Sequence, residues 1–135
     1  QITVRQLLTH TSGMPDVRDY HWDTPERDDL ALERYVRGLS SRQLQSAPGA
    51  ACSYSNMAFE VLGDVIAKVS GKTFEAAMRE AANNPSTDML IFDLAMNFAM
   101  RMAGGEEGLY QVADVLTRVR EEYGKQVAMV LYTRA

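Results

Sequence analysis

The stretch DMLIFDL, residues 88–94, is an apolar run that begins and nearly ends with an aspartate. A second apolar run, QVAMVLYT, occupies residues 126–133. Runs of this kind are typical of strands that are buried on both faces of a parallel sheet. Between the two runs, apolar residues recur with helical spacing from Leu109 to Tyr123, and Gly124 is a stop signal. Strand, helix and strand in this order predict a parallel βαβ unit.

The preceding half of the chain has the pattern of helices joined by loops. Thr3 followed by Gln6 is a capping-box signature for a short first helix. Helical spacing returns at residues 26–39 and is clearest at residues 58–69, after which the cluster at residues 83–86 predicts a turn. The predicted fold class is therefore α+β or α/β, with a helical N-terminal part packed on a small, mainly parallel sheet that ends in a C-terminal βαβ unit.

Composition and charge exclude several classes of function. The chain has 135 residues, of which 46% are hydrophobic and 24% charged, and a net charge of −4. This charge argues against nucleic acid or an anionic membrane as a partner, and no apolar run reaches the ~18 residues of a membrane span. The N-terminus lacks an initiator Met and a signal-peptide pattern, which suggests that the sequence begins inside a longer parent. Cys52, the single cysteine, excludes an internal disulfide.

The best candidate site is Tyr54-Ser55-Asn56, which follows the turn at Pro48-Gly49 and precedes a predicted helix. A phenol and an amide two residues apart on one loop can face the same substrate. A tyrosine acts as a base only when a nearby cation lowers its pKa from about 10. The alternative is structural: a tyrosine packed beside a helix start that Asn56 caps.

Two blocks in order, ITVRQLLTHTSGMPD at residues 2–16 and PGAACSYSNMAFEVLGDVIAKVSGKTFEAAMRE at residues 48–80, carry a family resemblance. Residues 1–80 resemble the serine β-lactamase-like family of class C β-lactamases, penicillin-binding carboxypeptidases and esterases. The resemblance implies acyl transfer to a serine and hydrolysis of a small β-lactam, peptide or ester. It makes Tyr54 and Asn56 the catalytic residues: the tyrosine transfers a proton with the catalytic serine, and the asparagine contacts a lysine and the substrate amide.

The same resemblance marks the residues that are missing. The nucleophile of the family lies in a Ser-x-x-Lys motif, and none of the serines in these 135 residues has a lysine three positions later. The Lys/His-Thr/Ser-Gly motif is absent too. HTSG, residues 10–13, is a structural landmark in the family, so Ser12 is not predicted as the nucleophile, and Ser55 has no evident base. We therefore predict that this chain is inactive.

No cofactor and no metal site are predicted. Two histidines and three aspartates lie near one another in the first part of the chain, but their spacing matches no standard metal site. Solvated loop charges explain them better. These residues are His10, Asp16, Asp19, His21 and Asp23.

The second half resembles a different family. Residues 80–94 and 113–133 are similar to the flavodoxin-like, succinyl-CoA-synthetase-type domain of NDP-forming acyl-CoA ligases, in having Asn-Pro before an Asp-led strand and Gly-Lys before the next strand. The phosphorylatable histidine of those enzymes has no counterpart here, because neither histidine lies in this half.

The sequence thus predicts two domains, a β-lactamase-like fragment at residues 1–80 and a βαβ flavodoxin-like fragment at residues 81–135. The turn at residues 83–86 is predicted to be exposed and poor in hydrogen bonds, as a seam between unrelated segments would be. The first hypothesis is a truncated or chimeric piece of a serine hydrolase. A non-catalytic CoA-ligase-like or interaction module is the alternative, and a fold that belongs to neither parent is a third. The position of Tyr54 distinguishes the hydrolase hypothesis from the non-catalytic module: it faces an open cleft in the first and packs against Ile66 and Val69 in the second.

Overall fold

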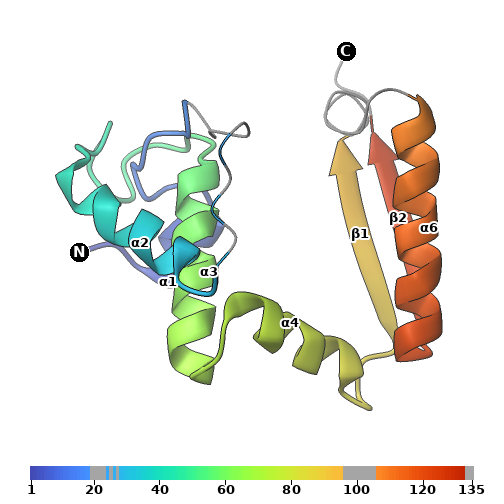
Figure 1. Ribbon diagram of the computed structural model, residues 1–135. Helices are drawn as coiled ribbons and strands as arrows, with labels where there is room; N and C mark the ends of the chain where they lie inside the picture. Colours follow the sequence, from blue (N-terminus) through green and yellow to red (C-terminus); the bar gives the residue numbers. More distant parts are fainter. Residues whose placement is uncertain (19–23, 25, 27, 96–105, 133–135) are drawn as a thin grey trace. The chain divides into compact units, whose positions relative to one another are not determined.

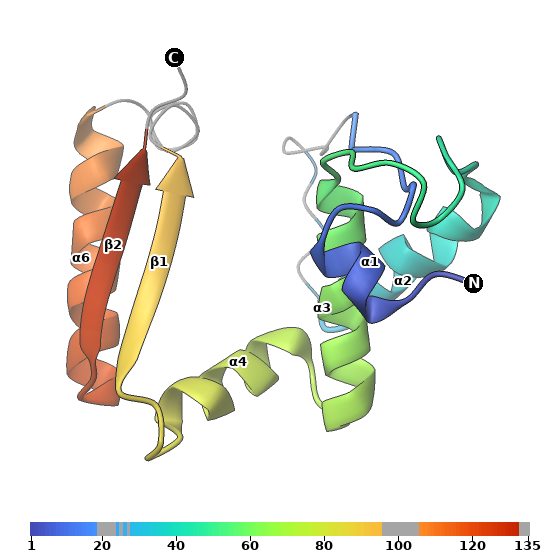
Figure 2. The same cartoon turned by 180° about the vertical axis from the view of Figure 1, so that it is seen from behind.

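The computed structural model describes residues 1–18, 24, 26, 28–95 and 106–132 of the chain (Figures 1 and 2). The chain divides into two compact units, Gln1–Ala77 and Met78–Ala135. The helix α4, Phe74–Asn83, begins in the first unit and ends in the second, and Glu80 lies within it. That residues 1–80 and 81–135 are separate domains stays a prediction.

The first unit is helical. Its other helices are α1 (Val4–Leu8), α2 (Ala31–Gly38), the 3-10 turn η1 (Leu39–Ser41) and α3 (Asn56–Ser70).

The ends of these helices follow the capping signals in the sequence. The Thr3 hydroxyl accepts a hydrogen bond from the Gln6 backbone N–H, and the Gln6 side chain accepts one from the Thr3 N–H, so the predicted capping box is present. Gly71 ends α3 in the left-handed conformation, with a φ of 68°.

A small core joins α1 to α3. Leu7 of α1, Met14 of the following loop, and Met57 and Ala58 of α3 are buried together. Burying each of the larger side chains stabilises the unit by roughly 1.5–3 kcal/mol. Leu7 and Met14 lie on either side of the HTSG segment, and Met57 and Ala58 follow the Tyr54-Ser55-Asn56 segment. This core therefore holds the two segments together.

Backbone hydrogen bonds reinforce the same junction. The Gly49 N–H donates to the Thr11 carbonyl at 2.7 Å, and the Gln45 N–H donates to the Gly13 carbonyl at 2.8 Å. Gly13 has a φ of +77°, and a Cβ built there would lie 2.2 Å from the Ser46 carbonyl oxygen. Only glycine therefore allows residues 45–49 to approach the HTSG loop this closely.

The second unit contains the predicted βαβ arrangement. Strand β1 (Met89–Ala95) pairs in parallel with β2 (Gln126–Tyr132), in a register that runs from Met89 opposite Gln126 to Ala95 opposite Tyr132. The helix α6, Glu106–Tyr123, connects the strands and packs along β2 (Figure 1). Its half-buried apolar side chains, Val112, Leu116, Val119 and Tyr123, repeat at helical spacing on one face. The α+β class and the parallel pairing are confirmed.

The prediction that both strands are buried on both faces is wrong. Met89, Ile91 and Val130 are 45%, 67% and 49% exposed. The cause is the size of the sheet: in the described part of the chain it has two strands and one covering helix. A single helix covers one face of such a sheet, so side chains that alternate onto the other face remain in solvent.

The turn at residues 83–86 is exposed, as predicted, but it is not poor in hydrogen bonds. The Asn84 carbonyl accepts from the Thr87 N–H at 2.9 Å and from Lys125 Nζ at 3.0 Å. Asn84 Oδ1 accepts from the Ser86 N–H at 2.8 Å, and the Thr87 hydroxyl donates to the Ala81 carbonyl at 2.8 Å. Short polar side chains satisfy the backbone here, because they form local turns that replace helical bonds.

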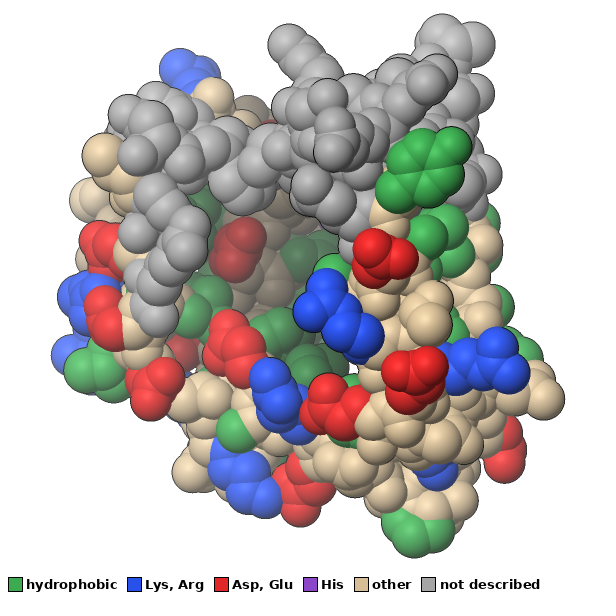
Figure 3. Space-filling model, turned by 45° about the vertical axis from the view of Figure 1, so that its right-hand side comes forward, with side chains coloured by type: hydrophobic (Ala, Val, Ile, Leu, Met, Phe, Trp, Pro, Cys, Tyr) green, Lys and Arg blue, Asp and Glu red, His purple; other side chains and the backbone are tan. Residues whose placement is uncertain are grey.

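Acidic and basic side chains are interspersed on the face shown in Figure 3. Within the described ranges, no helix combines the length and the apolar character that crossing a membrane requires.

Candidate functional site

The structure brings Tyr54 and Asn56 together at the N-terminus of α3. The Tyr54 hydroxyl donates to Asn56 Oδ1 at 2.8 Å. Tyr54 is 51% exposed, so its phenol can be reached from solvent while it is held by the amide. The pair therefore presents one hydroxyl and one amide to the same point, as the spacing of the tripeptide predicts.

His10 contacts the ring of Tyr54 and bonds to the backbone on either side of it. Its ring lies 4.7 Å from the Tyr54 ring and 5.1 Å from the Phe59 ring, between centroids. His10 Nδ1 accepts from the Ser55 N–H at 3.2 Å, and the His10 carbonyl accepts from the Ser53 N–H at 2.8 Å. An accepting Nδ1 places the proton of the neutral ring on Nε2. His10 is also the one described non-glycine residue with a positive φ, 55°, a strained conformation that often marks a functional site.

Ser55 is a buried capping residue and cannot be a nucleophile in this conformation. It is 0% exposed, and its hydroxyl accepts from the Ala58 N–H at 3.1 Å while it donates to the Pro15 carbonyl at 2.8 Å. The cap of α3 is therefore Ser55, and the alternative in which Asn56 caps this helix is wrong. Ser12 is buried as well, at 1% exposure, and its hydroxyl accepts from the Met14 N–H.

Asp16 is the residue of this site that sequence reasoning missed as a contact. Its Oδ1 accepts from the Asn56 N–H at 2.8 Å and from Asn56 Nδ2 at 3.2 Å. The two residues are forty positions apart, so no local pattern could have joined them. The only signal was that both lie in the two blocks that carry the family resemblance.

The carboxyl group of Glu60 on α3 and the phenol of Tyr35 on α2 both have a raised pKa. Burial raises the pKa of Glu60, one turn after Asn56. Burial, followed by the negative charge of Glu60, raises the pKa of Tyr35 on α2. Both shifts favour the neutral form of the group.

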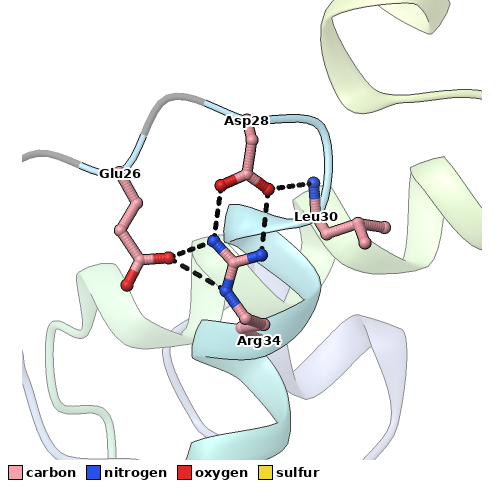
Figure 4. Close-up of polar contacts among 4 residues, drawn as sticks. All are labelled: Glu26, Asp28, Leu30 and Arg34. Carbon is pink, nitrogen blue, oxygen red and sulfur yellow. Dashed lines mark hydrogen bonds and ion pairs between the residues drawn. The ribbon is translucent and has the colours of Figure 1, made fainter.

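A separate ion-pair cluster fixes the start of α2 (Figure 4). The Arg34 guanidinium donates to both oxygens of Asp28, at 2.9 and 2.6 Å, and also pairs with Glu26. The Leu30 N–H donates to Asp28 at 3.0 Å. The hydrogen bond from Arg34 is the main cause that lowers the pKa of Asp28 to about 2, and the same contacts raise the pKa of Arg34. These charges satisfy one another and so form a structural cluster.

Two cavities are described in this unit. One, of about 620 Å³, is lined by residues of α2 and the C-terminal part of α3, including Leu32, Asp64 and Lys68. The other, of about 740 Å³, is lined by residues that include Asp16 and Met57. Tyr54 lines neither, and Val69 is 83% exposed. The Tyr54 ring lies against the ring of His10.

No metal centre is found among the residues that the structure describes, since no three potential ligands cluster there. Of the residues considered from the sequence, His10 and Asp16 have the roles given above. Asp19, His21 and Asp23 lie outside the described residues.

Comparison with known proteins gives this geometry its context. Residues 1–109 match the family model described as Beta-lactamase. The chain belongs to the beta-lactamase family. The resemblance of residues 1–80 to serine β-lactamase-like enzymes is therefore confirmed, and the family match continues beyond them.

Curated relatives agree with the family. The D-alanyl-D-alanine-carboxypeptidase/endopeptidase AmpH of Escherichia coli K12 is 34% identical over 87 residues, which are 62% of this chain and 22% of that protein. Penicillin-binding protein 4 of Amycolatopsis lactamdurans is 28% identical over 132 residues, 92% of this chain and 34% of that protein. Esterase EstB of Burkholderia gladioli is 30% identical over 99 residues, 62% of this chain and 24% of that protein. The chain thus spans about a third or less of each of these relatives.

Among solved structures, a D-amino acid amidase from Ochrobactrum anthropi SV3, complexed with L-phenylalanine amide, is similar to 62% of this chain and 28% of its own. Its sequence identity is 26% and its TM-score 0.49.

The beta-lactamase match crosses the predicted seam. The family model extends to residue 109, and the alignment with penicillin-binding protein 4 covers 92% of the chain. The resemblance of residues 81–135 to acyl-CoA ligases has no support in these comparisons.

Proposed function

We propose that these 135 residues carry one wall of an acyl-serine hydrolase site, formed by Tyr54 and Asn56, for a small amide or ester substrate. The observation that carries the proposal is the 2.8 Å hydrogen bond from the Tyr54 hydroxyl to Asn56 Oδ1, at an exposed position in a member of the beta-lactamase family. The relatives support the substrate class, because they are named as a carboxypeptidase/endopeptidase and an esterase.

In the proposed reaction, a serine hydroxyl attacks the carbonyl carbon of the substrate. The Tyr54 hydroxyl relays the proton: its oxygen accepts the proton of that serine while its own proton passes to the leaving amine or alcohol. The Asn56 amide holds the substrate or an activating lysine beside it. Water then releases the acyl group from the serine, with the proton transfer running in the opposite direction.

The nucleophile of this reaction is not among these residues. No serine here stands three positions before a lysine, and Ser12 and Ser55 are buried. We therefore expect the chain by itself to be inactive, as a piece of a hydrolase. The hypotheses of a chimera and of a CoA-ligase-like module rest on sequence pattern alone, and no contact or comparison favours them.

A graft tests the proposed role of Tyr54. The aligned segment of this chain replaces its counterpart in Esterase EstB, and hydrolysis of a p-nitrophenyl ester is measured for the graft. We expect activity that falls by at least ~100-fold in Tyr54→Phe, the low end for loss of a general acid–base group. Tyr35→Phe is the control, since Tyr35 lies on α2 and outside the hydrogen bonds of Asn56. A folded graft that is inactive, or that is equally active with Tyr54→Phe, contradicts the proposal.

A further inference from the structure

One carboxylate oxygen of Asp16 accepts hydrogen bonds from three N–H groups. Oδ1 accepts from the Val17 N–H at 2.9 Å, from the Asn56 N–H at 2.8 Å and from Asn56 Nδ2 at 3.2 Å. An ionised carboxylate accepts hydrogen bonds and cannot donate them. The group that faces it from Asn56 must therefore be the NH₂ end of the amide.

This contact decides which way the Asn56 amide points. With Nδ2 on Asp16, the opposite atom, Oδ1, is directed to Tyr54 and accepts from its hydroxyl at 2.8 Å. A flipped amide would place its oxygen against the carboxylate of Asp16 and its NH₂ against the Tyr54 proton. The bond to Asp16 would be replaced by a contact between two electronegative oxygens, and the Tyr54 hydroxyl would have to rotate and accept from the NH₂ group.

The orientation of the Asn56 amide also affects the hydroxyl of Tyr54, which is bonded to it. A phenol has one proton to donate. Because Asn56 Oδ1 accepts that proton, the orientation of the Asn56 amide decides the direction in which the Tyr54 hydroxyl donates.

A purely structural role for Asp16 makes a different prediction. The Asn56 N–H belongs to the first turn of α3, where N–H groups lack helical partners and a negative charge is favourable. The bond from Asp16 to that N–H alone would make Asp16 an auxiliary cap. Only the second bond, to Asn56 Nδ2, acts on the side chain of the site.

We propose that Asp16 is a positioning residue that fixes the orientation of the Asn56 amide and, through it, the direction in which Tyr54 donates its proton. The inference rests on the proposed function for its meaning in catalysis. Its geometry can be tested without turnover, so the inference and the proposed function can fail separately.

The experiment uses nuclear magnetic resonance on the full chain. Exchange of the Asn56 NH₂ protons reports whether Nδ2 keeps its hydrogen bond to Asp16, and so which way the amide points. Three-bond couplings to the side-chain carbon of Asn56 report its χ1 rotamer. We expect a single rotamer and slowed exchange in the unsubstituted chain and in Tyr54→Phe. We expect rotamer averaging and loss of the slowed exchange in Asp16→Ala. Asp29→Ala, at an exposed aspartate of the same unit, is the control and should change neither signal.

Asp16→Asn keeps the shape of the side chain and guards against loss of the fold. Its neutral carbonyl is a weaker acceptor, so exchange of the Asn56 NH₂ protons should be faster than in the unsubstituted chain and slower than in Asp16→Ala. Backbone amide signals of α3 serve as the check for folding. Slowed exchange of the Asn56 NH₂ protons in folded Asp16→Ala, exchange in Asp16→Asn that equals that of the unsubstituted chain, or loss of the slowed exchange in Tyr54→Phe alone would each overturn the inference.

Discussion

Replacing Gly13 by alanine should destabilise the first unit far more than the same change at Gly71. Both glycines have a left-handed backbone, with φ values of +77° and +68°. An alanine in this region costs roughly 1–2 kcal/mol wherever it stands. At Gly71 nothing lies within 4 Å of the added Cβ, so Gly71→Ala measures this conformational term alone.

Gly13→Ala adds a collision to that term. The new Cβ would lie 2.2 Å from the Ser46 carbonyl oxygen and 3.1 Å from its carbon, and these are backbone atoms that no side-chain rotation can move away. Residues 45–49 would have to shift by about 1 Å, at a cost of ~1–3 kcal/mol for overpacking. The shift also strains the adjacent bond from the Gln45 N–H to the Gly13 carbonyl, which contributes ~1 kcal/mol.

The sum is ~3–6 kcal/mol for Gly13→Ala, against ~1–2 kcal/mol for Gly71→Ala. Urea unfolding of both variants, followed by circular dichroism at 222 nm, measures the difference. We expect Gly71→Ala to stay folded with a lowered midpoint, and Gly13→Ala to lose most of the helical signal of the first unit in buffer. Equal midpoints for the two variants would refute the close approach of residues 45–49 to the HTSG loop.

Three further predictions concern the cap, the ion pair and the boundary between the units. Ser55→Ala should destabilise the chain by ~2–4 kcal/mol in urea unfolding, because it removes a helix cap and leaves the part-buried Pro15 carbonyl unpaired. Ser70→Ala, at the exposed end of the same helix, should change the free energy of unfolding by under ~0.5 kcal/mol. The carboxyl group of Asp28, followed by the signal of its carboxyl carbon, should titrate near a pKa of about 2. The stabilisation that ionised Asp28 contributes is therefore complete above the ordinary pKa of 3.8 and is lost as pH falls through 2. Arg34→Gln should move the titration midpoint of Asp28 back toward 3.8. Limited proteolysis should cut first near residues 83–86 and leave two fragments with separate melting transitions; one transition, with that turn protected, would contradict two independent domains.

The sequence predicted the elements of the fold because their signals are local. Apolar runs at residues 88–94 and 126–133, separated by a helical period, were enough to predict two parallel strands. Burial is not local in this sense. Ile91 has the sequence context of a buried strand, yet it is 67% exposed, because its burial depends on whether another element covers that face of the sheet.

The candidate site divides in the same way. Tyr54 and Asn56 are two positions apart, so their approach could be predicted from the tripeptide alone. Asp16 and His10 contact the same site from forty or more positions away, and their contacts depend on how α1 packs on α3. The sequence does not identify Ser55 as the cap of α3, because the neighbouring Asn56 is also a favoured capping residue. The cap is the one of these two residues that has the extended backbone, which here is Ser55.

We propose that these residues hold the Tyr54–Asn56 wall of a serine hydrolase site without its nucleophile, and one measurement tests this directly. The purified chain is incubated with a chromogenic cephalosporin and a p-nitrophenyl ester, and its intact mass is recorded after exposure to a covalent serine probe. We expect hydrolysis at the rate of buffer and an unchanged mass, because no serine here has an activating lysine. Turnover that disappears in Tyr54→Phe, together with one probe bound per chain, would contradict the claim and show that a nucleophile lies within these residues.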